Sequence, residues 1–248
     1  MLQIMRSIPG LRQLRMPPTW YGLFGLRHHR AIVITGHPRC GTTSAASICQ
    51  RLGREVGDEW VGAHGISSWM MAVDDRHNPY GDDELGHSRR NLTWDWLFLV
   101  VRDLATAVPS VMLENRFAPP SYEFRRKHIR KQLGIDLGDA PNEMARAVLS
   151  IICWSRIILR QSPDFSFRVE DQQTNFRDFL VEKKIVGREL SQHPVSEWEN
   201  AAKIYGNGVR PAKPMLTPQS WIDLPANLSA DVAWYCREFG YADPAAGR

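Results

Sequence analysis

The chain has 248 residues, of which 43% are hydrophobic and 23% charged, which suits one large globular domain and is short for two independent ones. Its formal net charge of +4 fits an anionic small ligand, but without a basic stripe it predicts no nucleic-acid binding. No apolar run is long enough for a membrane span, and the four cysteines show neither paired nor metal-ligand spacing, so we expect no membrane span and a reduced, cytoplasmic setting.

A short arm precedes the predicted domain. Residues 1–30 are rich in Arg, contain three prolines and lack the continuous apolar core of a secretory signal. We therefore predict an N-terminal arm over residues 1–30 and a single α/β domain over residues 31–248.

Apolar periodicity predicts the elements of this domain in chain order. Ala31–Thr35 is a β-branched run typical of a buried strand, and Thr43–Leu52 carries small or apolar residues at helical spacing. The other expected elements are strands at Glu55–Gly57, Trp96–Val101 and Phe165–Val169, and helices at Ile66–Ala72, Leu104–Asn115, Asn142–Arg160, Thr174–Lys184 and Ala230–Phe239. Strands that alternate with helices favour a three-layer α/β sandwich around a central parallel sheet.

Three polar segments are expected to lie outside the core. Residues 60–96 are rich in Gly, Asp, His, Asn and Pro and predict a loop-rich insertion. The basic run Arg125–Lys131 is typical of a solvated helix face, and His193–Asp223 is interrupted by prolines as loops are.

The segment between the first strand and the first helix carries the clearest chemical signal. Gly36–Thr43 reads GHPRCGTT, and a glycine loop in this position directs backbone N–H groups and a helix N-terminus at one anion. The spacing of Gly36 and Gly41 matches that of a nucleotide-binding P-loop, but Thr42 stands where that motif has its Lys. The cation is instead Arg39, inside the loop, which disfavours nucleoside triphosphate chemistry.

This loop resembles the 5′-phosphosulfate loop of sulfotransferases that use 3′-phosphoadenosine 5′-phosphosulfate (PAPS) and release 3′-phosphoadenosine 5′-phosphate (PAP). These enzymes have a P-loop fold without ATPase activity, so the resemblance implies a P-loop NTPase-like sulfotransferase fold with no metal. It also implies that Arg39 neutralises the leaving phosphate as the sulfonate departs. The same phosphate would be held by the loop and the helix start, namely Cys40, Gly41, Thr42, Thr43 and Ser44.

A second motif follows the strand at Trp96–Val101. Arg102 ends that strand and Ser110 lies eight residues further on, about 2.2 helical turns, so their side chains can face the same side. Arg offers a planar fork to a phosphate, and the pair resembles the 3′-phosphate motif of the same superfamily. Asp103 is expected to cap the helix that begins there.

Weaker similarities extend over most of residues 31–241. Arg210 and Lys213 lie where relatives place a nucleotide-covering loop, although the RKG sequence of the cytosolic enzymes is missing. Gly57–Trp69 and Trp221–Tyr241 resemble small bacterial-type sulfotransferase-like proteins. Ser44 departs from the cytosolic enzymes, in which a Trp after the double Thr stacks on adenine.

Sulfonate transfer needs a base for the acceptor proton. Glu59, just after the second predicted strand, matches the position of a Glu base in some branches of the superfamily, and His64 is the second candidate. A non-catalytic nucleotide-binding protein and a P-loop kinase or nucleotide hydrolase stay open as alternatives. The acceptor, whether a small molecule, glycan or lipid, and the oligomeric state are not defined by the sequence, because acceptor sites are built from variable loops.

Overall fold

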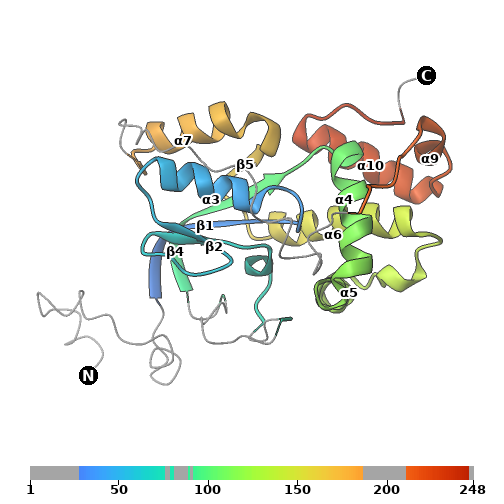
Figure 1. Ribbon diagram of the computed structural model, residues 1–248, viewed down its shortest axis with the longest axis horizontal. Coiled ribbons are helices and arrows are strands. Elements are labelled where there is room, and N and C mark those ends of the chain that lie inside the picture. Colours follow the sequence, from blue (N-terminus) through green and yellow to red (C-terminus); the bar gives the residue numbers. More distant parts are fainter. Residues whose placement is uncertain (1–27, 76–78, 81–88, 90–91, 187–210, 246–248) are drawn as a thin grey trace, which may run out of the picture.

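Five parallel strands form the centre of the computed structural model, which describes residues 28–75, 79–80, 89, 92–186 and 211–245 (Figure 1). The strands are β1 His28–Gly36, β2 Val56–Asp58, β3 Gly65–Ser67, β4 Leu92–Val101 and β5 Phe165–Arg168. Their order across the sheet is β2-β3-β1-β4-β5, and every neighbouring pair is parallel. The predicted α/β class with a central parallel sheet is therefore confirmed.

Helices account for most of the remaining described residues. They are α3 Thr42–Arg51, α4 Leu104–Phe117, α5 Pro119–Leu133, α6 Glu143–Leu159, α7 Arg177–Glu182, α9 Pro218–Ile222 and α10 Ala226–Phe239. Single turns add η2 Trp69–Ala72, η4 Leu137–Asp139, η5 Val169–Asp171 and the π-helical η6 Gln172–Phe176. No helix in the described part of the chain is both long and apolar enough to cross a bilayer.

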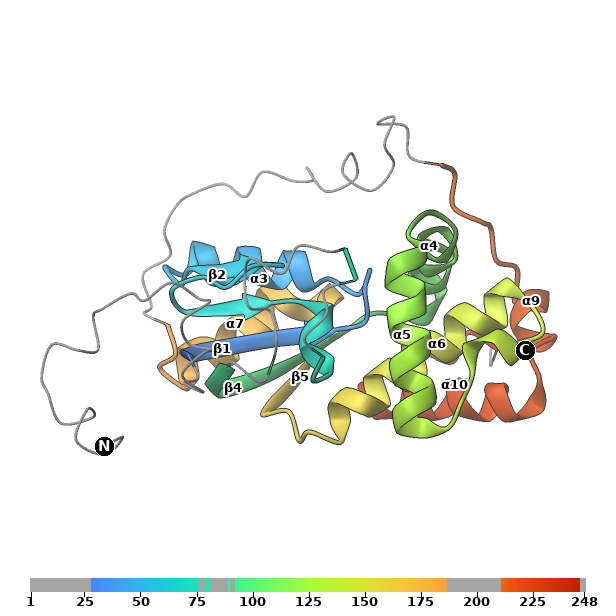
Figure 2. The same cartoon turned by 90° about the horizontal axis from the view of Figure 1, so that it is seen from below.

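Alternation along the two central strands separates the layers. Ile32 and Ile34 of β1 join the core cluster under α3 and α7, together with Phe98 of β4. On the opposite face, Leu99 and Val101 of β4 pack against α4, α6 and α10. Both faces are thus covered, which gives three layers, and Figure 2 shows α4, α5, α6 and α10 grouped beside the sheet, with α3 lying along it.

The predicted cap of α4 is present, and α6 has a cap of the same kind. The Asp103 carboxylate accepts the Thr106 backbone N–H at 3.1 Å at the start of α4, and the Asn142 side chain accepts that of Ala145 at 2.8 Å at the start of α6. Helix α10 begins four residues earlier than predicted, and the short helix α9 lies in a segment that we expected to be a loop.

The prediction that residues 60–96 lie outside the core is wrong for Gly65–Val73, and residues 76–78, 81–88 and 90–91 lie outside the described residues. Residues 65–67 form a strand between β2 and β1, where we expected the start of a helix, and every residue from Gly65 to Val73 is buried. Strand β4 also begins at Leu92, four residues before the predicted strand. Three-residue strands carry too little periodicity to be distinguished from loops.

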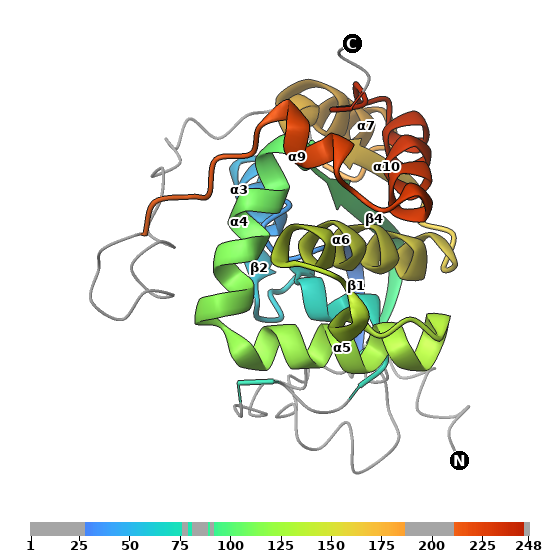
Figure 3. The ribbon, with the colours of Figure 1, turned by 90° about the vertical axis from the view of Figure 1, so that its right-hand side faces the viewer.

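The basic run on α5 is also not a uniformly solvated face. Arg125 is fully buried and His128 is 4% exposed, whereas Arg126, Lys127 and Arg130 form ion pairs with acidic residues on the outer side. In Figure 3, α5 lies alongside α6, and Arg125 on the inner side of this basic helix donates to Ser150 of α6. Most of the predicted N-terminal arm lies outside the described residues, and its last three positions, 28–30, belong to β1.

Candidate functional site

The carboxyl ends of the strands gather the residues singled out by the sequence. Beyond β1 the chain turns towards β2, whereas beyond β4 it turns towards β5, on the other side of the sheet. Adjacent strands whose connections diverge leave a crevice between them at their carboxyl ends, and ligands of open α/β sheets bind there. This places the loop after β1 beside Arg102 at the end of β4.

Two glycines give the loop its path. A Cβ at Gly36 would lie 2.4 Å from the Val100 carbonyl oxygen of the neighbouring strand, and a Cβ at Gly41 would lie 2.4 Å from a methyl of Val169. Gly41 also has φ 106°, which L-residues avoid. The loop therefore needs glycine at both positions.

Arg39 lies between these glycines with φ 71°, in the left-handed region. Its carbonyl oxygen accepts a hydrogen bond of 3.1 Å from Arg102 Nη1, which joins two motifs 63 residues apart in sequence. Because the first turn of a helix leaves its N–H groups without intrahelical partners, the start of α3 turns a positive edge towards the same crevice.

The Arg102 side chain borders a surface cavity of about 400 Å³. Lys213 lines the same cavity, so the structure brings together two of the cations predicted to bind phosphate. Arg102 Nε also donates to Thr106 Oγ1 at 3.2 Å, and the Tyr235 hydroxyl donates to the Arg102 carbonyl at 2.9 Å. Arg210 lies outside the described residues.

Ser110 does not line this cavity. Its residue is 2% exposed, and its Oγ has no hydrogen-bond partner among the described residues. On the next turn of α4, Oε2 of Glu114 is buried and equally without such a partner. The structure thus places Ser110 on the buried side of α4, one turn from a carboxylate, and does not bring it together with Lys213.

Glu59 lies on the other flank of the loop, immediately after β2. It is a non-glycine residue with φ 59°, and its backbone N–H donates to the Ser67 carbonyl at 3.0 Å. Strained backbone of this kind is concentrated at functional sites. The Ser68 hydroxyl donates to Oε2 of Glu59 at 2.5 Å.

The Glu59 carboxylate is electrostatically unusual. Burial raises its pKa from 4.5 to about 8, against the opposing hydrogen bonds from Ser68 and the Trp69 backbone, and Asp58 raises it further. A carboxyl group that titrates near neutral pH can accept or donate a proton under physiological conditions.

The buried strand β3 links Glu59 to the loop. The Ser67 hydroxyl donates to the Thr42 carbonyl at 2.7 Å, and the Ser68 N–H donates to the Ile34 carbonyl at 2.9 Å. Ser67 and Ser68 therefore fix Glu59 beside the start of α3. Sequence reasoning missed both serines because it placed residues 60–96 outside the core.

His64 is not part of this cluster. It lies just before β3, at the amino end of that strand, and its carbonyl accepts the Ile32 N–H at 3.0 Å. Its Nδ1 accepts the Glu55 backbone N–H at 3.0 Å. The length of β3 separates it from the loop at the carboxyl edge.

The remaining loop residues have structural partners. Cys40 is 1% exposed, and burial raises the pKa of its thiol to about 12, so it is a neutral packing group. The Ser44 hydroxyl accepts a hydrogen bond of 2.5 Å from Gln172 Nε2 in the π-helical turn η6. All four cysteines are free and buried.

Comparison with protein-family models, with curated proteins and with solved structures gave no match to this chain.

Proposed function

We propose that the carboxyl edge of the sheet binds a nucleotide through two separate phosphates. The observation that carries this proposal is the contact between Arg102 and the Arg39 carbonyl, because it joins a glycine loop at a helix start to a second cationic centre. The cavity shared by Arg102 and Lys213 gives that second centre room for an anion. The class that we propose is a P-loop-like nucleotide-binding protein for a ligand with two phosphate positions.

Within that class, the function that fits best is a PAPS-dependent sulfotransferase. Arg39 replaces the Lys of triphosphate-binding loops, and a 3′,5′-bisphosphate nucleotide carries two phosphates, one for each of the two cationic centres. In this proposal Arg39, Gly41 and the start of α3 hold the 5′-phosphate, and Arg102 with Lys213 holds the 3′-phosphate.

The Glu59 flank supplies the base. An acceptor hydroxyl or amine attacks sulfur while the S–O bond to the 5′-phosphate breaks, so that the bonding electrons leave with the phosphate. Glu59, ionised, takes the acceptor proton, and Arg39 balances the charge that develops on the leaving phosphate. A carboxyl with its pKa near 8 is a stronger base than an ordinary Glu, at the cost of being protonated below that pH.

Ligand-induced thermal shifts test the proposal directly. The bisphosphate PAP, at one hundred times its dissociation constant, is expected to add about 2.7 kcal/mol to the free energy of unfolding. For a chain of this size that raises the melting temperature by about 5–10 °C. AMP, which lacks the 3′-phosphate, is expected to give a smaller shift at the same concentration.

Two outcomes would overturn it. Stabilisation by ATP with Mg²⁺ but not by PAP would favour a kinase or nucleotide hydrolase. Equal shifts with PAP and AMP would show that no group of the protein reads the 3′-phosphate.

A further inference from the structure

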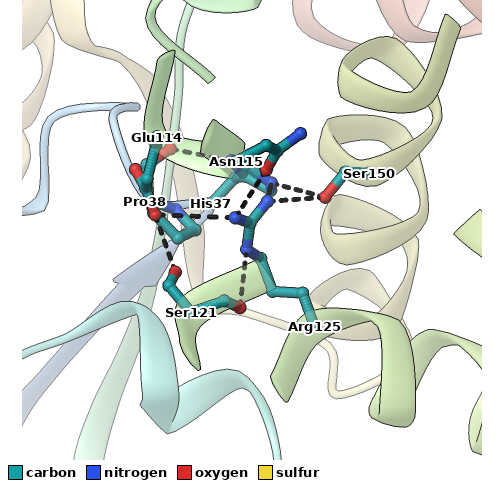
Figure 4. A network of polar contacts seen from close by, with 7 residues as sticks. All are labelled: His37, Pro38, Glu114, Asn115, Ser121, Arg125 and Ser150. Atoms are coloured by element: carbon teal, nitrogen blue, oxygen red, sulfur yellow. Dashed lines mark hydrogen bonds and ion pairs between the residues drawn. The ribbon is translucent and has the colours of Figure 1, made fainter. Parts of the chain in front are cut away.

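A buried polar network lies directly behind the loop (Figure 4). At its centre is Arg125 of α5, a side chain with no solvent exposure. A buried guanidinium costs several kcal/mol unless its charge and all its N–H groups are satisfied. Arg125 has no role in the sulfonate transfer proposed above, so its burial points to a different function.

Every N–H of the Arg125 guanidinium faces an acceptor. Nε donates to the Ser121 carbonyl at 3.2 Å, and Nη2 donates to Asn115 Oδ1 at 3.0 Å and lies 3.5 Å from the Glu114 carboxylate. Nη1 lies 2.8 Å from Ser150 Oγ and 2.9 Å from His37 Nε2. The acceptors come from α4, α5, α6 and the loop, so Arg125 joins three helices to the residue that opens the loop.

The contacts of His37 define its tautomer. Nδ1 lies 2.7 Å from the Pro38 carbonyl oxygen, which can only accept, so Nδ1 carries the hydrogen. Nε2 is then the acceptor for Arg125 and for the Ser150 hydroxyl, 2.9 Å away. Burial and the Arg125 charge hold the pKa of His37 well below its ordinary value, in agreement with this neutral form.

The His37 contact orients the next peptide unit. In a planar trans peptide the C=O and N–H groups point in opposite directions. When His37 holds the Pro38 carbonyl towards the helices, the Arg39 N–H must point away from them. The Arg39 carbonyl is in turn held by Arg102, so both peptide groups beside Arg39 have fixed directions.

We propose that Arg125 is a positioning residue, which acts through His37 to hold the phosphate loop, and Arg39 within it, in the conformation that receives the anion. Arg125 does not touch the ligand in this arrangement. It fixes the imidazole, the imidazole fixes the Pro38 peptide, and that peptide fixes Arg39. The identity of the anion rests on the proposed function, whereas the positioning of the loop does not.

The buried cysteines provide a readout that needs no nucleotide. Cys40 lies in the loop, and Cys49, Cys153 and Cys236 lie elsewhere in the core. Opening of the loop alone exposes Cys40, whereas global unfolding exposes all four thiols. Labelling with N-ethylmaleimide, followed by peptide mass mapping, measures the rate at each cysteine separately.

Arg125→Lys keeps the charge opposite Glu114 but loses the planar fork. We expect Cys40 to be labelled about tenfold faster or more, as for loss of a buried charged hydrogen bond, with the other cysteines within about twofold of the wild type. Arg126→Gln is the matched control, because Arg126 is the next residue on α5 and pairs with Asp136 at 2.6 Å, away from the loop. It should leave Cys40 unchanged.

His37→Gln tests whether Arg125 acts on the loop through His37. It is expected to raise Cys40 labelling to a similar degree, and the Arg125→Lys/His37→Gln double variant should rise no further than the larger single effect. If the two residues acted independently, the factors would multiply to about a hundredfold. If Arg125→Lys does not fold, Ser150→Ala, which removes one donor to His37, should give a rise of about threefold at Cys40 alone.

A Cys40 rate that stays at the wild-type value, a rise shared by all four cysteines, or multiplying factors would each overturn the inference. PAP titration of the same variants separates this outcome from the proposed function. If the wild type fails to bind PAP while Cys40 responds as described, the sulfotransferase proposal falls and the positioning role of Arg125 stands. If PAP binds, Arg125→Lys should weaken it about tenfold and Arg126→Gln should not.

Discussion

The two flanks of the phosphate loop differ in how far their charged side chains are exposed to solvent. On the β4 side, Arg102 borders an open cavity, keeps its charge in partial contact with solvent and shares the space with Lys213. On the β2 side, the Glu59 carboxylate is only partly exposed, and its burial raises its pKa to about 8. The loop itself bonds to both sides, through the Arg39 and Thr42 carbonyls.

This difference separates binding from proton transfer. A permanent, hydrated cation holds an anion over a wide pH range, as a phosphate requires. A carboxyl with a raised pKa responds to small changes of pH, as a general base requires. One edge of a sheet can thus hold a charged nucleotide on one side and handle an acceptor proton on the other.

A substitution that distorts the phosphate loop should have the largest effect on stability and on PAP binding, because the loop bonds to both flanks. Gly41→Ala adds a Cβ 2.4 Å from a Val169 methyl at φ 106°. We expect it to lower the free energy of unfolding by about 3 kcal/mol, from left-handed strain and overpacking together, and to abolish PAP binding. Urea denaturation and calorimetric titration measure the two effects.

Gly53→Ala is the matched control. Gly53 also has a positive φ, 75°, but a Cβ there meets nothing within 4 Å. Gly53→Ala should lower the free energy of unfolding by only about 1 kcal/mol, because it adds left-handed backbone strain without overpacking. It should leave PAP binding intact. Similar losses for the two variants would show that Val169 does not constrain the loop.

Arg102→Ala should affect the β4 flank alone. Loss of a charge-assisted contact to phosphate is expected to weaken PAP binding by about 2–3 kcal/mol, or about 30- to 150-fold, and AMP binding by much less. Calorimetric titration of the variant with each nucleotide measures the difference. Glu59→Gln, on the opposite flank, should leave PAP affinity within about threefold, since Glu59 does not contact the nucleotide phosphates in the proposed arrangement.

The two flanks also differ in how far the sequence could predict them. Arg39, Gly41 and Arg102 follow long buried strands, where apolar runs and glycine spacing are strong signals, and the structure brings Arg39 and Arg102 together. Lys213 could be placed in the shared cavity only from the structure, because proline-rich segments carry no periodicity.

The β2 flank was harder to predict because its elements are short. Glu59 was singled out from its position after a strand, but Ser67 and Ser68, which hold it, lie in the three-residue strand β3 and the residue after it. Arg125 was predicted to be solvated because its neighbours on α5 are basic, and nothing in the sequence distinguishes Arg125 and His128, which are buried, from the exposed residues of the same run. Such contacts depend on tertiary packing between distant segments.

Glu59 should also make the β2 flank sensitive to pH. Its folded-state pKa of about 8 lies above the ordinary 4.5, so the folded protein binds more protons than the unfolded chain between these values. The stability of the wild type should therefore fall relative to Glu59→Gln as the pH rises from about 5 to about 9, by about 2 kcal/mol, less than the full shift because Glu59 is partly exposed.

Urea denaturation of both proteins at several pH values measures this difference. Glu143→Gln is the control of opposite sign, because Arg116 lowers the pKa of Glu143 and its contribution is lost as the pH falls rather than as it rises. A constant difference between wild type and Glu59→Gln over this range would show that the Glu59 carboxyl is ionised throughout, and the contrast between the flanks would disappear.

The smallest effect is expected at His64, the second candidate base of the sequence. His64→Ala leaves the Glu55 N–H without its acceptor at the amino end of β3, whereas His64→Asn can retain an oxygen near the Nδ1 position. We expect a loss of about 1 kcal/mol in unfolding free energy for Ala and less for Asn, with PAP affinity unchanged for both. A loss of PAP affinity in His64→Asn, or a shift in the pH dependence assigned to Glu59, would mean that His64 communicates with the carboxyl edge through β3. In that case the binding flank and the proton-transfer flank would not be independent, because β3 would couple His64 to both of them.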